Sequence, residues 1–240
     1  KLMKLMVMSR TYQQSSQASP ELLEKDPNNE LLARGTRHRL SAEMIRDNVL
    51  AASGLLVKKI GGPSVKPYQP EGLWQEKATF VGENRYIEGT GDDLYRRSLY
   101  TYWRRTIPPP SMITFDVPDR NMCTVKRQST TTPLQPLVML NDPQYLEAAK
   151  VLAERVVISE NERVETQITK AFRLLTSRFP KEGELHTLKE LYLDEMKRFE
   201  DEPENMVRIL EIGEYKLKPT MMNAKIAALT IVNNVIMNFD

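Results

Sequence analysis

Apolar side chains spaced three and four residues apart dominate the second half of the chain. This spacing places them on one face of an α-helix. It predicts five helices, over residues 143–156, 159–175, 180–199, 205–212 and 220–239. Start signals support two of them: Asp142 caps a helix with proline at its first position, and Ser159 with Glu162 matches a capping box. The last pattern is apolar over a wide arc, which indicates burial among several neighbours.

Start and stop signals also mark the first half of the chain. Ser41 is a good N-cap, and the apolar stripe behind it predicts a helix that ends at the Gly-Gly-Pro breaker of residues 61–63. Residues 1–12 read as the end of an amphipathic helix whose start is missing. Residues 13–30 are polar and are expected to form a connector.

Residues 57–91 interrupt the helical pattern. They are rich in glycine and proline and contain short β-prone pieces, such as residues 78–81. The segment is too long for a passive connection, and long ordered loops are often functional. We therefore expect a mostly α-helical, irregular multi-helix domain that spans residues 1–240. It would carry this Pro/Gly-rich insertion and at most a minor β element.

Composition and charge narrow the range of functions. The net charge of +2 over 240 residues does not by itself indicate a nucleic-acid partner, and no apolar run approaches the roughly 18 residues that span a bilayer. The single cysteine, Cys123, excludes an internal disulfide. His38 and His186 lie far apart in the sequence, and the chain has neither a CxxC nor a CxxCH motif. We expect no metal site and no cofactor in this chain.

Residues 92–143 are the expected carrier of function. The stretch opens with a predicted aromatic and basic helix over residues 94–106, breaks at a triple proline, and crosses a loop rich in aspartate and arginine. Residues 92–127 hold seven Lys/Arg against four Asp/Glu, whereas residues 181–214 hold five against eleven. The acidic run is explained by a solvated helix face without any function.

Aromatic and arginine side chains are the candidate ligand-binding groups of this region. Stacking on aromatic rings and bidentate hydrogen bonds from arginine would suit a flat or anionic ligand, including a glycan. The alternative is that the aromatic residues fill the core and the arginines pair with the chain's own acids. The candidates are Tyr95, Trp103, Arg104 and Arg105 in the predicted helix, with Tyr68 and Trp74 in the insertion.

The loop Phe-Asp-Val-Pro-Asp-Arg at residues 115–120 contains the candidate catalytic groups. Asp116 and Asp119, with Arg120, could serve as an acid/base pair or as oxygen ligands of a hard cation. They equally suit turn and capping roles beside a proline. Cys123 follows the loop next to basic residues, but we expect it to be a buried small apolar residue.

Four ordered blocks carry a resemblance to a known family. They are LSAEMIRDNVLAASGLL (40–56), GGPSVKPYQPEGLW (61–74), DLYRRSLYTYWRRTIPPPSMITFDVPDR (93–120) and TPLQPLVMLNDP (132–143). Together they resemble a domain family of unknown function that is abundant in Planctomycetes and Bacteroidetes. Thr131, where the family pattern has asparagine, and Pro136, where it has alanine, are departures that affect the local turn.

The resemblance implies the setting of the domain. In that family the domain lies C-terminal to a planctomycete-type cytochrome c domain and a second uncharacterised domain. This chain would then be the C-terminal part of a large extracytoplasmic protein, periplasmic or anchored in the outer membrane. Haem would be bound by a separate upstream domain. The family has no established catalytic residues that could be carried over.

Three functional hypotheses follow. The first is a binding or docking module of a multidomain cytochrome-linked protein. Its expected partners are the upstream domains, with carbohydrate as a candidate ligand, and not nucleic acid. The second is a carboxylate-dependent enzyme that acts on polysaccharide. The third is a structural domain that supports its upstream neighbours. A structural domain would expose an apolar patch where its neighbour packs.

Overall fold

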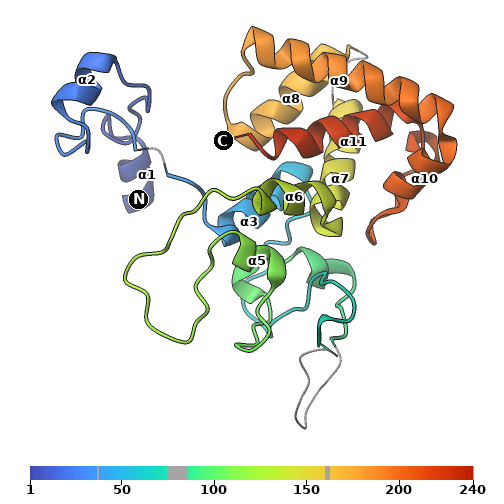
Figure 1. Cartoon of the computed structure of the whole chain (residues 1–240), viewed down its shortest axis with the longest axis horizontal. Coiled ribbons are helices and arrows are strands. Elements are labelled where there is room, and N and C mark those ends of the chain that lie inside the picture. The colour runs from blue at the N-terminus through green and yellow to red at the C-terminus, as the bar shows by residue number, and fades with distance from the viewer. Residues whose placement is uncertain (37, 75–85, 160–162, 240) are drawn as a thin grey trace. The chain divides into compact units, whose positions relative to one another are not determined.

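The computed structural model describes residues 1–36, 38–74, 86–159 and 163–239. The chain forms two compact units, Lys1–Arg39 and Leu40–Asp240. Both units are coloured along the chain in Figure 1. The prediction of a single domain over the whole chain stays a prediction.

The first unit is a small arrangement of two short helices, α1 (Leu2–Val7) and α2 (Pro20–Lys25). The hydroxyl of Ser19 caps α2, which starts at a proline, as helix start signals require. The buried carboxylate of Asp26 accepts the backbone N–H groups of Glu30 and Leu31 at 2.8 and 2.9 Å. These bonds fix the turn after α2 and lower the pKa of Asp26.

The second unit is a bundle of helices with an irregular region attached (Figure 1). Its described residues include three 3₁₀ turns, η1 (Gly91–Tyr95), η2 (Ser98–Tyr100) and η3 (Pro219–Met221). Its described α-helices are α3 (Ala42–Ser53), α5 (Pro110–Thr114), α6 (Leu134–Asn141), α7 (Pro143–Ser159), α8 (Val164–Thr176), α9 (Glu182–Asp201), α10 (Pro203–Glu211) and α11 (Ala224–Ile236).

Helices α7 and α11 form the centre of the core. α11 packs against α7, α8 and α9, while α3 packs on another side of α7. Ala149 and Ala153 of α7 and Ala228 of α11 are fully buried, and such small side chains let helix backbones approach closely. The wide apolar arc predicted for the last helix is explained by these several neighbours.

The mostly α-helical fold class is confirmed. The described residues contain no strand, and their β structure consists of isolated bridges, such as those that join Val57 to Arg96 and Val65 to Thr101. The β-prone residues 78–81 lie outside the described part of the chain. No helix among the described residues is long and apolar enough to cross a membrane.

The helix predicted over residues 94–106 is wrong. The segment contains the end of η1, the turn η2 and a further turn at residues 105–106, between the bridged residues Arg104 and Ile107. The buried guanidinium of Arg96 explains the difference, because it donates to the backbone carbonyls of Lys59, Gly61 and Pro63 in the insertion. These bonds, with the bridge at Val57, pair the segment with the insertion and compete with a local helix.

Several helix ends differ from the predicted ones; the last helix, for example, is Ala224–Ile236 and not 220–239. α3 ends at Ser53 rather than at residues 61–63, because Gly54 adopts a left-handed conformation with φ of 92° and closes the helix. Ser159 is the last residue of α7 and does not begin the next helix. Its expected capping partner, Glu162, lies outside the described residues. Helix α6, which was not predicted, carries Pro136 in its first turn, where proline is tolerated.

Candidate functional site

The predicted site residues are distributed among three separate groups in the structure. Tyr68 and Tyr95 lie against α7 and the segment that follows α10. The Tyr95 hydroxyl donates to Oε1 of Glu147 at 2.9 Å, and the Tyr68 hydroxyl accepts the backbone N–H of Glu214 at 2.9 Å. Burial, with the nearby charge of Glu147, raises the pKa of Tyr68 to about 12. Tyr68 attaches the insertion to the helical bundle, and Tyr95 attaches the turn η1 to it.

Trp74 belongs to the second group and is only 4% exposed. Its Nε1–H donates to Oε1 of Gln69 at 2.8 Å. The ring of Tyr86 lies 5.3 Å from its ring centre, and the guanidinium of Arg104 lies 5.1 Å from it. The indole is therefore covered by neighbouring side chains of the same unit, which leaves it little surface on which a ligand could stack.

Trp103 forms the third group with Arg120. The guanidinium of Arg120 lies 4.1 Å from the ring centre of Trp103, which is a cation–π contact. Trp103 is half-buried and packs against the main core. Arg105 is exposed.

Asp116 and Asp119 each organise the loop in which they lie. The carboxylate of Asp116 accepts both the backbone N–H and the hydroxyl of Thr130, at 2.6 and 2.8 Å. Asp119 accepts the backbone and side-chain amides of Asn121, which lower its pKa. An ionised Asp119 has no proton to donate as a general acid. No group of three or more potential metal ligands occurs among the described residues.

The prediction that Cys123 is buried is wrong, because its side chain is exposed. Residues 119–131 run over the surface as an exposed loop. The loop is fixed near its ends by the bond between Asp116 and Thr130 and by an ion pair between Arg127 and Glu43 at 2.7 Å. The apolar neighbours of Cys123 were misleading because this loop does not fold back on the core.

Sequence reasoning missed a buried polar face on α7. Glu147, Lys150 and Glu154 lie on it, and all three are buried. The Lys150 ammonium donates to the carbonyls of Leu210, Ile212 and Tyr215 at 3.2, 2.6 and 2.8 Å. Burial lowers the pKa of Lys150 to about 8. The sequence signal was the spacing of Glu147, Lys150 and Glu154 at i, i+3 and i+7, which places three charges on one face of the helix.

Arg46 of α3 is a second buried cation, and its side chain is only 2% exposed. Its guanidinium donates to Oε1 of Gln144 at 2.6 Å and to the carbonyls of Arg96 and Leu94, both at 2.7 Å. One side chain thus joins α3, α7 and the segment after η1. We interpret this role as structural, because the acceptors are a side chain of α7 and two backbone carbonyls.

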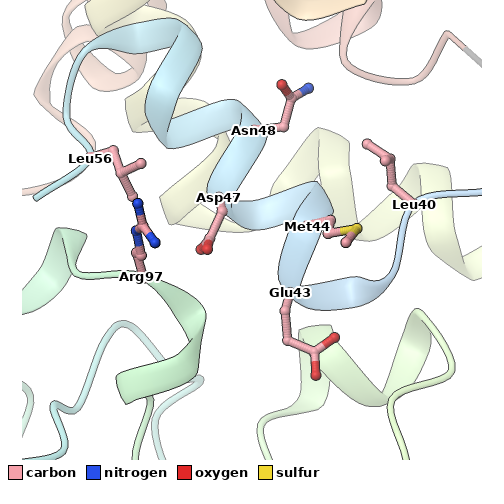
Figure 2. A pocket seen from close by; sticks show the side chains of 7 residues that line it. All are labelled: Leu40, Glu43, Met44, Asp47, Asn48, Leu56 and Arg97. Atoms are coloured by element: carbon pink, nitrogen blue, oxygen red, sulfur yellow. The ribbon is translucent and has the colours of Figure 1, made fainter. Parts of the chain in front are cut away.

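A pocket of about 400 Å³ opens beside α3 (Figure 2). Its polar groups are mostly engaged: Asp47 accepts the backbone N–H of Ser98 at 2.8 Å, and Glu43 pairs with Arg127. Burial alone would raise the pKa of Glu43, but the bonds from Arg127 outweigh it and the pKa is lowered. The lining residues are Leu40, Glu43, Met44, Asp47, Asn48, Leu56 and Arg97.

Helix α6 presents an apolar face to solvent. Leu134, Leu137 and Leu140 recur every three residues and are 61%, 55% and 40% exposed. The opposite side of the helix is anchored by buried Gln135 and Met139. We call Leu134, Leu137 and Leu140 the α6 leucine face. Residues 128–141 contain no charged side chain, so nothing on this helix disfavours contact with another apolar surface.

Comparison with known proteins identifies the family of this chain. A family described as "Protein of unknown function (DUF1553)", PSD1, matches residues 1–192. The chain belongs to this family. The match includes the first unit and continues in the second unit through most of α9. No curated protein and no solved structure matches the chain.

Proposed function

We propose that this DUF1553 domain is a docking module that binds another domain of its own polypeptide through the α6 leucine face. The observation that carries the proposal is the exposure of three leucines in register on one ordered helix. Single exposed apolar residues are normal on protein surfaces, whereas an apolar stripe on a fixed helix is typical of a contact surface.

Burial of this face contributes part of the free energy of docking. Full burial of a leucine side chain stabilises by about 1.5–3 kcal/mol relative to exposure. The α6 leucines are about half exposed, so covering them contributes about 1 kcal/mol each. Adjacent Ile113 of α5, which is 48% exposed, adds to the same region because α5 packs against α6. Helix α6 is already folded, so docking orders few additional groups.

The resemblance supports the identity of the partner. It implies that a second uncharacterised domain and a cytochrome c domain precede this one, in an extracytoplasmic protein. We therefore name as partner the domain that directly precedes this one in the polypeptide, and call it the preceding domain. Haem belongs to the cytochrome domain in this proposal. A glycan ligand is not proposed, since the covered indole of Trp74 offers little stacking surface.

The polysaccharide-enzyme alternative has less support. Its two candidate carboxylates, Asp116 and Asp119, are engaged by Thr130 and Asn121 within their own loop. A general acid needs a pKa raised toward the working pH, and that of Asp119 is lowered. Docking therefore accounts for more of the observed geometry than catalysis does.

The test is a binding titration of the preceding domain, produced separately, with this chain. Leu137→Asp introduces a charge into the centre of the α6 leucine face and should weaken binding at least about tenfold, because a buried unpaired carboxylate is costly. The matched control is Leu193→Asp on α9, where the leucine is 45% exposed. It should bind like the wild type. Equal affinity of both variants would contradict the proposal.

A further inference from the structure

The pocket beside α3 is lined by two opposite charges that do not pair with each other. Asp47 and Arg97 both line it, and the exposed guanidinium of Arg97 has no hydrogen bond or ion pair to any described residue. Oδ1 of Asp47 accepts the backbone N–H of Ser98 at 2.8 Å and lies 3.9 Å from the guanidinium of Arg46. Oδ2 of Asp47 has no partner among the described residues. A cation and a carboxylate oxygen are therefore both available to one ligand.

The fold holds these two charges in a fixed relation. The bond from the Ser98 N–H to Asp47 ties the residue next to Arg97 to α3. The carbonyl of Arg97 accepts the backbone N–H of Tyr100 at 2.9 Å, which fixes the start of η2. Both walls of the pocket belong to the second unit. A ligand would thus meet backbone positions that are already set, which lowers the entropy cost of binding.

The lining groups also follow an order along the pocket. Figure 2 shows Asp47 between Arg97 on one side and Met44 and Leu40 on the other. Met44 and Leu40 are 60% and 46% exposed, so this end of the pocket offers an apolar surface that the chain itself leaves uncovered. The order is a cation, then a carboxylate, then an apolar surface.

This order matches the three groups of an apolar α-amino acid. A guanidinium binds a carboxylate through two parallel hydrogen bonds, and the carboxylate of Asp47 can accept a charge-assisted bond from an ammonium group. An apolar side chain would cover Met44 and Leu40. The volume of about 400 Å³ lies within the range of small-molecule sites. We propose that this pocket binds a small zwitterion with an apolar side chain, of the class of free leucine or methionine.

Ligands with a single charge fit the pocket less well. A carboxylate without an ammonium group would face Asp47 unpaired, and an amine without a carboxylate would leave Arg97 without a partner. Glu43 lines the same pocket, but its charge is already paired with Arg127 at 2.7 Å. The proposal uses no residue of the α6 leucine face, so it goes beyond the proposed docking function and stands or falls separately from it.

The test is a ligand-observed NMR titration of the full chain with L-leucine and three probes. The probes are 4-methylpentanoate, which lacks the ammonium group, 3-methylbutylamine, which lacks the carboxylate, and glycine, which lacks the apolar side chain. Leucine should bind at least about tenfold more tightly than each probe, because only leucine engages all three parts of the pocket. Equal affinities for leucine and the single-charge probes would overturn the proposal, as would the absence of leucine binding at about 10 mM.

Two substitutions assign the charges. Arg97→Gln should weaken leucine binding at least about tenfold and leave that of 3-methylbutylamine unchanged. Asp47→Asn keeps an oxygen for the Ser98 N–H, and should weaken leucine binding without weakening that of 4-methylpentanoate. Arg105→Gln removes a charge from an exposed position outside the pocket and should bind leucine like the wild type. Leucine binding that survives both pocket substitutions would place the ligand elsewhere and overturn the proposal.

Discussion

The hydroxyl of Tyr95 lies 2.9 Å from Oε1 of Glu147, the same carboxylate oxygen that accepts the backbone N–H of Tyr215 at 2.7 Å. Three segments that are distant in the sequence therefore meet at one buried carboxylate. The contact joins the turn η1 to α7 and to the segment after α10. It fixes the irregular region relative to the bundle.

Tyr95→Phe should lower the free energy of unfolding by about 1–3 kcal/mol, because it removes a donor from the buried carboxylate of Glu147. Urea denaturation measures this directly. Tyr12→Phe is the control, since Tyr12 is 68% exposed, and it should change stability by less than about 0.5 kcal/mol. Equal effects of the two substitutions would show that the Glu147 contact contributes nothing.

Gly213→Ala should destabilise the fold for two reasons: an alanine is strained at the positive φ of this position, and its methyl group would clash with Glu147. Gly213 has φ of 83°, and a Cβ atom there would overlap the carboxyl group of Glu147. Gly72 has φ of 81° with nothing near its would-be Cβ, so Gly72→Ala isolates the backbone cost of about 1–2 kcal/mol. We expect Gly213→Ala to cost at least about 1 kcal/mol more than this control in urea denaturation. If Gly213→Ala and Gly72→Ala lower the free energy of unfolding equally, the Glu147 side chain can move away from the added methyl group without cost, which would contradict the prediction.

The contribution of Tyr215 to stability should depend on pH. Its hydroxyl donates to Oε2 of Glu154 at 2.7 Å, which, with burial, raises its pKa to about 12. The folded state then keeps a proton that the unfolded state loses near pH 10, so this stabilisation is complete below pH 10 and is lost as the pH rises to 12.

The measurement is the difference in free energy of unfolding between the wild type and Tyr215→Phe. It should be about 1–2 kcal/mol at pH 8 and decrease above pH 10. Other tyrosines titrate in both proteins, so the difference isolates Tyr215. A difference that stays constant from pH 8 to pH 11 would contradict the role of the bond to Glu154.

Arg46→Lys should destabilise the second unit by about 3 kcal/mol or more. Lysine cannot reproduce the planar array of donors that reaches Gln144, Arg96 and Leu94, and buried acceptors would lose their partners. The control is Arg97→Lys at the neighbouring exposed position, for which less than about 0.5 kcal/mol is expected. Thermal denaturation of both variants measures the two losses of stability. A loss for Arg46→Lys as small as that for Arg97→Lys would contradict the prediction and indicate that water replaces the guanidinium.

Local signals in the sequence predicted much of the bundle. Asp142 caps α7 as expected, with Oδ1 2.9 Å from the backbone N of Gln144. Ser41 caps α3 in the same way. Such signals act within one helical turn, and they are readable from sequence for that reason. Gly54, which ends α3, is also a local signal, although the Gly-Gly-Pro sequence of residues 61–63 is a stronger helix breaker.

The contacts that decide the irregular region join residues far apart in the sequence. Arg96 and Arg46 donate to carbonyls that are 33 to 50 residues away in the sequence. The amphipathic pattern of residues 94–106 does not reveal these hydrogen bonds. Trp74 was expected to be a candidate binding residue because aromatic residues on stiff loops often are, but burial depends on tertiary packing. Helix α6 was missed because its apolar residues face both the core and solvent, which removes the periodicity.

The central claim is that the α6 leucine face is covered by the preceding domain. The most direct test replaces Leu137 by cysteine in a Cys123→Ser background and measures its rate of modification by a maleimide, with and without a saturating amount of the preceding domain. Docking predicts that the rate falls at least about tenfold at position 137, while Leu193→Cys in the same background reacts unchanged. Unchanged rates at both positions, with binding shown to be saturated, would contradict the claim.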